Sequence, residues 1–303
     1  MTPGKNKSGA REAIFARKPV VSGRIQKGML YMVDRLAAST NTYHSYTLEE
    51  ALDGISRAGF RSVELTSVPG WTEHVSRDAD DAEIQRVKDL LAQYGLTAVS
   101  LSGHSDLVSD AGVAEFRKAL DLARNLGITK ITTSTGGHAD TSSGSLADQR
   151  AAFLERIGPL ADEAARDGID ICLETHGGLL ATGEISKALI ADIGRPNIGI
   201  NYDPGNVIHY GDVRPECDLP GSVDKVTHMH VKDQIGGVGV WNFPQVGTGE
   251  VDFPALFKVL DDAGFDGPCS IEIEFQGEPW PPLAEVDRAM AESFRYVRQF
   301  VPD

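Results

Sequence analysis

The chain has 303 residues, of which 41% are apolar, and this length and composition are typical of one large globular α/β domain. It carries 29 Lys and Arg against 44 Asp and Glu, so its formal net charge is −15 at pH 7. Because phosphate binding needs a basic surface, this charge argues against DNA or RNA as a partner. No stretch reaches the roughly 20 apolar residues that a membrane-spanning helix needs, so we expect no membrane partner either.

The cysteines and the N-terminal segment bear on the compartment. Cys172, Cys217 and Cys269 form no CxxC pair, which favours a reducing compartment without disulfide bonds. Residues 1–28 are basic but lack the 7–15-residue apolar run of a secretory signal. We therefore expect a cytoplasmic protein with a flexible tail over residues 1–24 and one catalytic domain over 25–303. A transit peptide is the alternative for the acid-poor N-terminus.

Short apolar runs recur along the chain at the spacing expected of strands that alternate with helices. The first run is "GMLYMV", and the last, "CSIEIEF", is followed by one more helical pattern. The eight predicted strands are residues 28–33, 62–66, 97–102, 130–135, 169–175, 198–203, 225–231 and 269–275.

The segments between these strands have helical periodicity and recognisable ends. Thr47 and Glu50 have the spacing of a capping box. Asp80 is expected to cap the next helix, which would end near Gly95. The weakest helix prediction lies between the sixth and seventh strands, around the short segment "RPECDLPGS".

Strict alternation of eight strands with helices predicts a single closed (β/α)₈ TIM barrel rather than a doubly wound sheet. The phosphate-binding signatures of the doubly wound folds are also missing. No GxGxxG follows the first predicted strand, and "STGGHAD" is not a P-loop.

In such a barrel the active site lies at the carboxyl ends of the strands, where polar residues gather in this sequence. Because residues two apart on a strand share a face, each pair would face the same mouth. The polar residues are Glu64, Thr66, Ser102, His104, His138, Glu174, His176, Asn201, Asp203, His228, His230, Lys232, Glu272 and Glu274.

Two Glu, one Asp and one His from four successive strand ends would make an oxygen-rich site for one divalent cation. Such ligands suit Mn²⁺, Mg²⁺, Co²⁺ or Zn²⁺. Without a cation, three carboxylates at one apolar mouth would repel each other. The residues alone leave two questions open. His228, one pleat deeper than His230, is either a ligand or a hydrogen-bonded core residue, and Glu274 is either a substrate group or a rim carboxylate.

Five segments resemble the xylose isomerase-like barrels, the sugar phosphate isomerase/epimerase group that shares its fold with the AP endonucleases. The resemblance covers nearly the whole chain after residue ~25, and its motifs are specific to the superfamily but not to one substrate. They are "LETHGG" (173–178), "INYDPGNVIHYG" (200–211), "HMHVKD" (228–233), "VGTGEVDF" (246–253) and "GPCSIEIEF" (267–275).

This resemblance implies one divalent metal ion, Mn²⁺ before Mg²⁺, Co²⁺ or Zn²⁺, on Glu174, Asp203, His230 and Glu272. His230 is chosen because it opens the "HxKD"-like segment, and Glu272 because it follows the "GxxSI" lead-in. His228 would then pack below the site.

The resemblance also implies chemistry next to a sugar carbonyl, by removal of an α-proton and a metal-stabilised enediolate. It assigns catalysis to Glu174, Glu272, Lys232 and His176, and substrate binding to His104, His138, Asn206, Trp241 and Glu274. His104 and His138 are alternative acid–base groups. The rings of Trp71, Trp241 and Trp280 would either wall the sugar site or pack within their loops.

One departure from the family pattern concerns the residue three after Asp203. Related ketose epimerases place there a His that contacts sugar, whereas this chain has Asn206. The endonuclease branch needs that His and an Asp-x-His segment for three zinc ions, and the chain has neither.

We therefore expect a metal-dependent sugar isomerase or epimerase acting on a small sugar or keto-sugar derivative, in a homo-oligomer. The first alternative is a lyase or deglycosidase that eliminates the aglycone from 3-keto-glycosides after the same proton abstraction. The second is a non-catalytic sugar-binding or partner-dependent barrel subunit.

Overall fold

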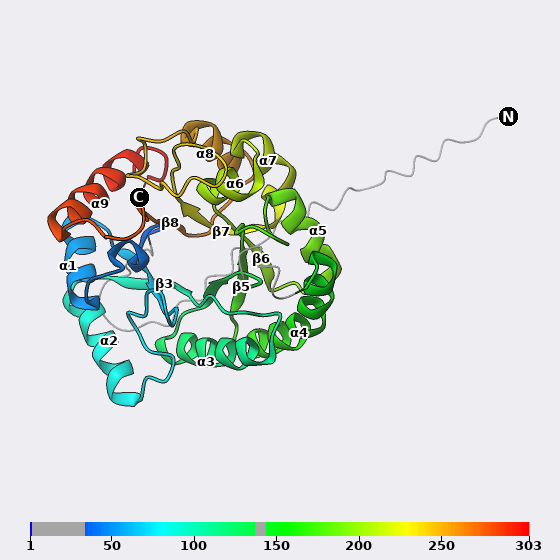
Figure 1. Ribbon diagram of the computed structural model, residues 1–303, viewed down its shortest axis with the longest axis horizontal. Helices are drawn as coiled ribbons and strands as arrows, with labels where there is room; N and C mark the ends of the chain where they lie inside the picture. Colours follow the sequence, from blue (N-terminus) through cyan, green and yellow to red (C-terminus); the bar gives the residue numbers. More distant parts are fainter. Residues whose placement is uncertain (2–33, 137–143, 303) are drawn as a thin grey trace. The chain divides into compact units, whose positions relative to one another are not determined.

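The computed structural model describes residue 1, residues 34–136 and residues 144–302. Within the unit Val33–Asp303, eight parallel strands close into one barrel in the order β1 to β8, surrounded by helices, as predicted (Figure 1). The strands are β1 Leu36–Ser39, β2 Ser62–Thr66, β3 Thr97–Ser102, β4 Lys130–Thr133, β5 Asp170–Glu174, β6 Ile198–Tyr202, β7 Val226–Val231 and β8 Cys269–Ile271.

The first strand differs from the sequence prediction. The predicted strand 28–33 lies outside the described residues, and the barrel begins with β1 instead. β1 closes the barrel because Ala37 pairs with Ser62 of β2 and Leu36 pairs with Cys269 of β8. The segment "LAAS" is short and weakly apolar, so only its neighbours on both sides identify it as a strand. β8 is also shorter than predicted, and Glu272 and Glu274 follow its end.

Nine α-helices lie within the described ranges, and several begin as the sequence predicts. The Thr47–Glu50 capping box is formed, and the Asp80 side chain caps α2 by accepting from the backbone of Glu83. The helices are α1 Leu48–Ala58, α2 Asp81–Gln93, α3 Asp110–Leu126, α4 Leu146–Arg166, α5 Gly183–Ile193, α6 Pro204–Gly211, α7 Pro215–Ser222, α8 Phe253–Asp262 and α9 Leu283–Val297.

The interval between β6 and β7, the weakest prediction, holds two short helices, α6 and α7, each beginning with a proline. Proline suits this position because the first helical residue needs no backbone donor. Of the helices within residues 34–136 and 144–302, none combines the length and the apolar character needed to cross a bilayer.

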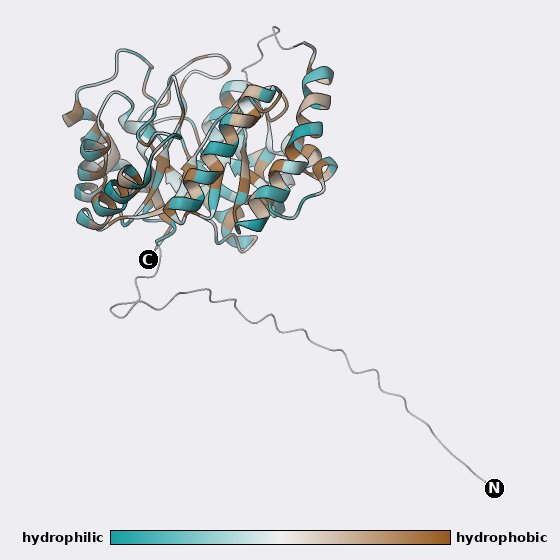
Figure 2. Cartoon of the chain, turned by 90° about the horizontal axis from the view of Figure 1, so that it is seen from below, coloured by the Kyte–Doolittle hydropathy of each residue, from teal (hydrophilic) through white to brown (hydrophobic). Residues whose placement is uncertain are grey.

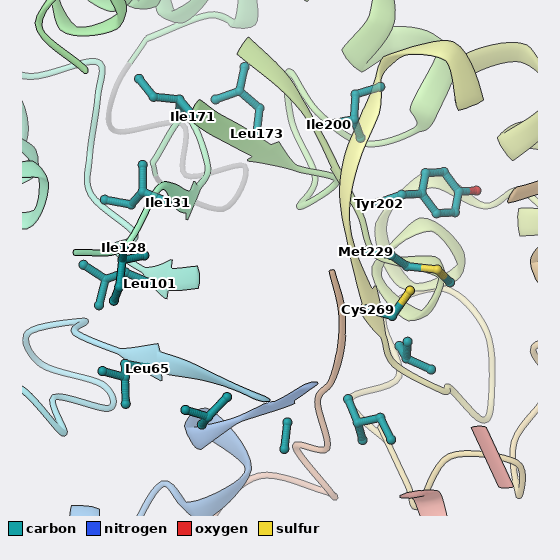
Figure 3. Close-up of a cluster of buried hydrophobic side chains, with 14 of the residues drawn as sticks. Leu65, Leu101, Ile128, Ile131, Ile171, Leu173, Ile200, Tyr202, Met229 and Cys269 are labelled. Atoms are coloured by element: carbon teal, nitrogen blue, oxygen red, sulfur yellow. The ribbon is translucent and has the colours of Figure 1, made fainter. Parts of the chain in front are cut away.

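The strand residues alternate between two environments. One set is apolar and packs toward the helices, whose outer surfaces are mostly hydrophilic (Figure 2). Figure 3 shows members of this set, such as Leu65, Ile171 and Tyr202, on the outer side of the ring of strands. The other set faces the barrel axis, where Ser100 of β3 lies 3.0 Å from His228 of β7 although these strands are not neighbours.

This interior is unusually polar, because branched aliphatic residues fill most barrels of this kind. Buried polar groups need hydrogen-bond partners, so the interior set must form a connected network. Its members include Glu64, Ser100, Asn201, His228 and His230, all at most 1% exposed.

Candidate active site and metal centre

The four predicted metal ligands meet at the carboxyl ends of four successive strands. Glu174 is the last residue of β5, Asp203 follows β6 as the cap of α6, His230 lies in β7, and Glu272 follows β8. All four are buried, and one potential ligand atom from each lies within 4.8 Å of the others.

Two atoms at this meeting point lack a hydrogen-bond partner among the described residues. They are Nδ1 of His230 and Oδ2 of Asp203, which face each other at 3.6 Å. Nδ1 of His230 also lies 3.4 Å from oxygens of Glu174 and Glu272. Buried polar atoms without partners are costly. Three carboxylates and one imidazole nitrogen directed at one point therefore fit a divalent cation well.

The pKa shifts of His230 and Asp203 show which charges this site favours when no cation is bound. Burial lowers the pKa of His230, but the carboxylates of Glu272, Glu64 and Glu174 outweigh burial and raise it well above its usual range. Burial raises the pKa of Asp203 to about 6, although Lys232 opposes this shift. Positive charge is thus favoured among these carboxylates. A proton on His230 and a divalent cation would compete for the same site.

Lys232 and Asn41 hold the two carboxylates that follow β8. Nζ of Lys232 lies 2.6 Å from Glu274 and 3.1 Å from Glu272, and it stands 4.4 Å from the centre of the Phe243 ring. Nδ2 of Asn41 donates to the other oxygen of each carboxylate, at 3.0 Å in both cases. Burial also raises the pKa of Glu274 to about 7, against the effect of Lys232.

Asn41 is a site residue that the sequence analysis missed. With the first strand expected at 28–33, Asn41 was not predicted to lie at a strand end, whereas in the structure it follows β1 directly. Its signal was present in the sequence, as the run "STNT" directly after "LAA".

Of the three histidines predicted at the site besides His230, two lie within the described residues. Nε2 of His104 lies 3.0 Å from Oε2 of Glu174, and the His176 ring packs against the His104 ring with centroids 5.3 Å apart. His138 lies outside the described residues.

Asn206 is buried and donates to Oε1 of Glu174 at 2.8 Å. It is not among the cavity-lining residues, so its expected contact with a substrate stays a prediction. Asn201 donates to the other Glu174 oxygen at 3.2 Å.

A cavity of about 340 Å³ opens above the candidate metal centre. Glu174, Glu272 and Lys232 line it, together with His104, His176, Glu274 and Asn41. Trp71 and Trp241 line it as well, and their rings meet edge to face. Trp280 is not a lining residue, but its ring packs against that of Trp71, and its Nε1 donates to the backbone oxygen of Thr42. The cavity thus combines carboxylates, cationic groups and flat apolar faces, which suits a small polar ligand such as a sugar.

His228 packs below the site, as the resemblance implies. It is fully buried, with Nδ1 2.8 Å from Oδ1 of Asn201 and Nε2 3.0 Å from Oε2 of Glu64. Burial raises the pKa of Glu64, but His230 and His228 outweigh burial and hold it well below its usual range. Glu64 is therefore an ionised carboxylate under the candidate metal centre.

Comparison with known proteins is consistent with this geometry. The sequence pattern of the xylose isomerase-like TIM barrels matches residues 52–299. A ketose 3-epimerase of Arthrobacter globiformis is 29% identical over 233 residues, covering 70% of this chain and 76% of that protein. An inosose dehydratase of Geobacillus thermodenitrificans is 25% identical over 235 residues, covering 68% of this chain and 70% of that protein.

Solved structures share the fold at low sequence identity. D-psicose 3-epimerase, crystallised in the presence of D-fructose, aligns with a TM-score of 0.72 at 19% identity, covering 88% of this chain and 99% of that one. The IOLI protein, which contains a zinc atom, aligns with a TM-score of 0.72 at 16% identity and the same coverage.

Proposed function

The chain belongs to the xylose isomerase-like TIM barrel family, and from this premise we propose that it is a divalent-metal-dependent sugar epimerase or isomerase. One observation carries the proposal. Glu174, Asp203, His230 and Glu272 converge on one point, and two of these carboxylates also line the cavity above it. The similarity to a ketose 3-epimerase supports the same class of reaction.

Four protein groups would hold the cation, through carboxylate oxygens of Glu174, Asp203 and Glu272 and Nδ1 of His230. A bound divalent cation supplies Lewis-acid polarisation of a substrate carbonyl, which makes the neighbouring C–H more acidic. Mn²⁺ is our first choice for this donor set, and Mg²⁺, Co²⁺ and Zn²⁺ also suit it.

Proton transfer falls to the two carboxylates that line the cavity. Glu174 and Glu272 approach it from β5 and from the end of β8, which are not neighbours in the barrel. One carboxylate would accept the α-proton from one face of the sugar, and the other would return a proton to the opposite face. His104, whose Nε2 lies 3.0 Å from Glu174, is placed to exchange with Glu174 the proton that this carboxylate accepts or returns.

Lys232 would steady negative charge that develops on the substrate oxygen. Its ammonium group lies on the cavity wall, within reach of Glu272 and Glu274. The indoles of Trp71 and Trp241 would cover the apolar face of the sugar ring, and His176 and Glu274 would bind its hydroxyls.

A lyase is the second candidate, favoured by the similarity to an inosose dehydratase. Elimination begins with the same proton abstraction and ends with loss of a β-substituent instead of reprotonation. The substituent would be water or, in a 3-keto-glycoside, the aglycone.

The test is solvent deuterium exchange, followed by NMR and mass spectrometry, for Mn²⁺-loaded protein with ketoses and 3-keto-glycosides in D₂O. An epimerase introduces deuterium and otherwise conserves the carbon skeleton, whereas a lyase also releases a leaving group. Glu272→Gln and Glu174→Gln should slow exchange by about 10²–10⁴-fold. Glu73→Gln, at an exposed position after β2, is the matched control and should not.

Failure of the metal-loaded protein to exchange any of these substrates would contradict both enzymatic proposals. A sugar-binding or partner-dependent barrel would then remain.

A further inference from the structure

The two ring nitrogens of His230 have different surroundings. Nδ1 faces the carboxylates of the candidate metal centre, at 3.4–3.6 Å. Nε2 points the opposite way, into the barrel interior, where it lies 2.9 Å from Oε1 of Glu64. Glu64 comes from β2, across the barrel from β7, and has no exposed surface.

This contact determines which nitrogen of His230 carries the proton. An ionised carboxylate only accepts hydrogen bonds, so Nε2 must donate to Glu64. In the neutral ring, which is the form that binds a cation, Nδ1 then has a free lone pair directed at Asp203, Glu174 and Glu272. A metal-binding His commonly donates its other ring N–H to a carboxylate in this way, which fixes both its tautomer and its ring orientation.

A second connection runs from Glu64 to another candidate ligand. Oε2 of Glu64 lies 3.0 Å from Nε2 of His228, and the Ser100 hydroxyl is 2.7 Å from Glu64 and 3.0 Å from His228. Nδ1 of His228 lies 2.8 Å from Oδ1 of Asn201, whose Nδ2 donates to Glu174. Glu64 is thus in contact with His230 and with His228, and the other nitrogen of His228 contacts Asn201, which donates to Glu174.

We propose that Glu64 is a positioning residue, which holds His230 from below in its metal-binding tautomer and ring orientation. The inference rests on the proposed metal-dependent function. Glu64, which belongs to the polar interior of the barrel, would thus stabilise the candidate metal centre from below.

A competing interpretation is a second metal site, because Glu64, His228 and His230 also have ligand atoms within 4.8 Å of one another. The hydrogen bonds favour the positioning role of Glu64 over a second metal site. Nε2 of His228 is 3.0 and 3.2 Å from the hydroxyls of Ser100 and Ser270, so it already has partners. The unpartnered atoms of the described chain in this region, on His230 and Asp203, lie on the side of the upper site.

The test compares Mn²⁺ binding to metal-stripped wild type, Glu64→Gln and Glu64→Met by isothermal titration calorimetry. Gln retains one acceptor for His230, whereas Met fills the space without an acceptor. We expect Glu64→Met to weaken Mn²⁺ binding by about 10–100-fold and Glu64→Gln by less. The control is Ser62→Ala at the start of β2, which removes a buried hydrogen bond to the backbone oxygen of Asp34 at 2.7 Å and should leave the affinity within about threefold of wild type.

Histidine ¹⁵N NMR of the Zn²⁺-bound forms, which are diamagnetic, supplies a readout that a general loss of stability would not change. Wild type should show His230 bound through Nδ1 with its proton on Nε2, and Glu64→Met should show a mixture of rings bound through Nδ1 and through Nε2. If Glu64→Met does not fold, Glu64→Gln carries the comparison.

The outcomes are distinct. Wild type that binds no Mn²⁺ would contradict the proposed function itself. If wild type binds Mn²⁺ and both Glu64 variants bind it with the same affinity, the positioning role is wrong, but the proposed function is not contradicted. Two Mn²⁺ ions per wild-type chain, with one lost in Glu64→Met, would overturn it in favour of a second metal site.

Discussion

At the scale of single residues, burial of charge is the dominant feature of the site. Lys232 is 2% exposed, and its charge is balanced by Glu272 and Glu274 and by the face of Phe243. Removing one partner of such a group is costly because it leaves the others buried without compensation. The pair Glu272 and Glu274 would be left as two adjacent carboxylates.

Replacing Lys232 by Met should therefore reduce the free energy of unfolding at pH 7.5 by about 3 kcal/mol. Urea denaturation measures the loss. The double variant Lys232→Met with Glu274→Gln should recover part of the stability, because it removes one of the two like charges. If the double variant is as unstable as the sum of the single variants, the charge balance is not the cause.

His74 provides a pH test away from the metal centre. Its Nε2 lies 3.0 Å from the Tyr46 backbone oxygen, and Nδ1 is buried without a hydrogen-bond partner in the described part of the chain. Burial lowers the pKa of His74, so the folded state prefers the neutral ring. The unfolded state therefore binds more protons below the ordinary pKa of about 6.5.

The stability due to neutral His74 is full above about pH 6.5 and is lost as the pH falls toward the lower folded pKa. His74→Gln cannot titrate, so its melting temperature should fall less than that of wild type between pH 7.5 and pH 5. Calorimetry at both pH values checks this. Equal decreases in the two proteins would show that His74 does not contribute.

At the scale of elements, the first and last helices hold the barrel closed from outside. Arg57 of α1 pairs with Asp287 of α9 at 2.7 Å, and the rings of Phe60 and Phe294 lie 4.7 Å apart. α1 depends on its start, where Thr47 accepts from the backbone of Glu50 and Glu50 in turn accepts from the backbone of Thr47.

Thr47→Ala should lower the free energy of unfolding by about 1 kcal/mol, because one backbone donor at the helix start loses its partner. Thr47→Ser retains the hydroxyl and serves as the control, with little expected loss. Chemical denaturation of both variants measures the difference. Equal stability of the Ala and Ser variants would contradict a role for the cap.

At the scale of the whole molecule, the ends of four strands, β5 to β8, meet at the candidate metal centre. A cation bound only by the folded state would stabilise it by about 2.7 kcal/mol when its free concentration is 100 times the dissociation constant. The candidate ligands are spread from Glu174 to Glu272, so this stabilisation would apply to the barrel as one cooperative unit.

Adding Mn²⁺ to metal-stripped protein should therefore raise the melting temperature by roughly 5–10 °C. Asp203→Asn is a matched variant, because Asn caps α6 as well as Asp does but contributes no ligand charge. It should keep its fold and lose most of the Mn²⁺-dependent shift. Elemental analysis should find about one metal ion per wild-type chain. An equal shift in Asp203→Asn would exclude Asp203 from the site.

The sequence by itself determined the alternation of strands with helices, for seven of the eight barrel strands, and the polar residues at the strand ends. Both follow from local properties. The period of the apolar residues distinguishes strands from helices, and parallel strands in a barrel bring their carboxyl ends to one face. Polar residues of strands five to eight could therefore be predicted as neighbours without knowledge of their distances, and the resemblance to the family selected Glu174, Asp203, His230 and Glu272 among them.

Only the tertiary structure decided which strand begins the barrel, and with it the place of Asn41 beside Glu272 and Glu274. It likewise directed Asn206 to Glu174 and placed Glu64 under His230. These contacts join residues 32 to 233 positions apart. They depend on strand register and on closure of the barrel, and a local sequence pattern carries no information about either.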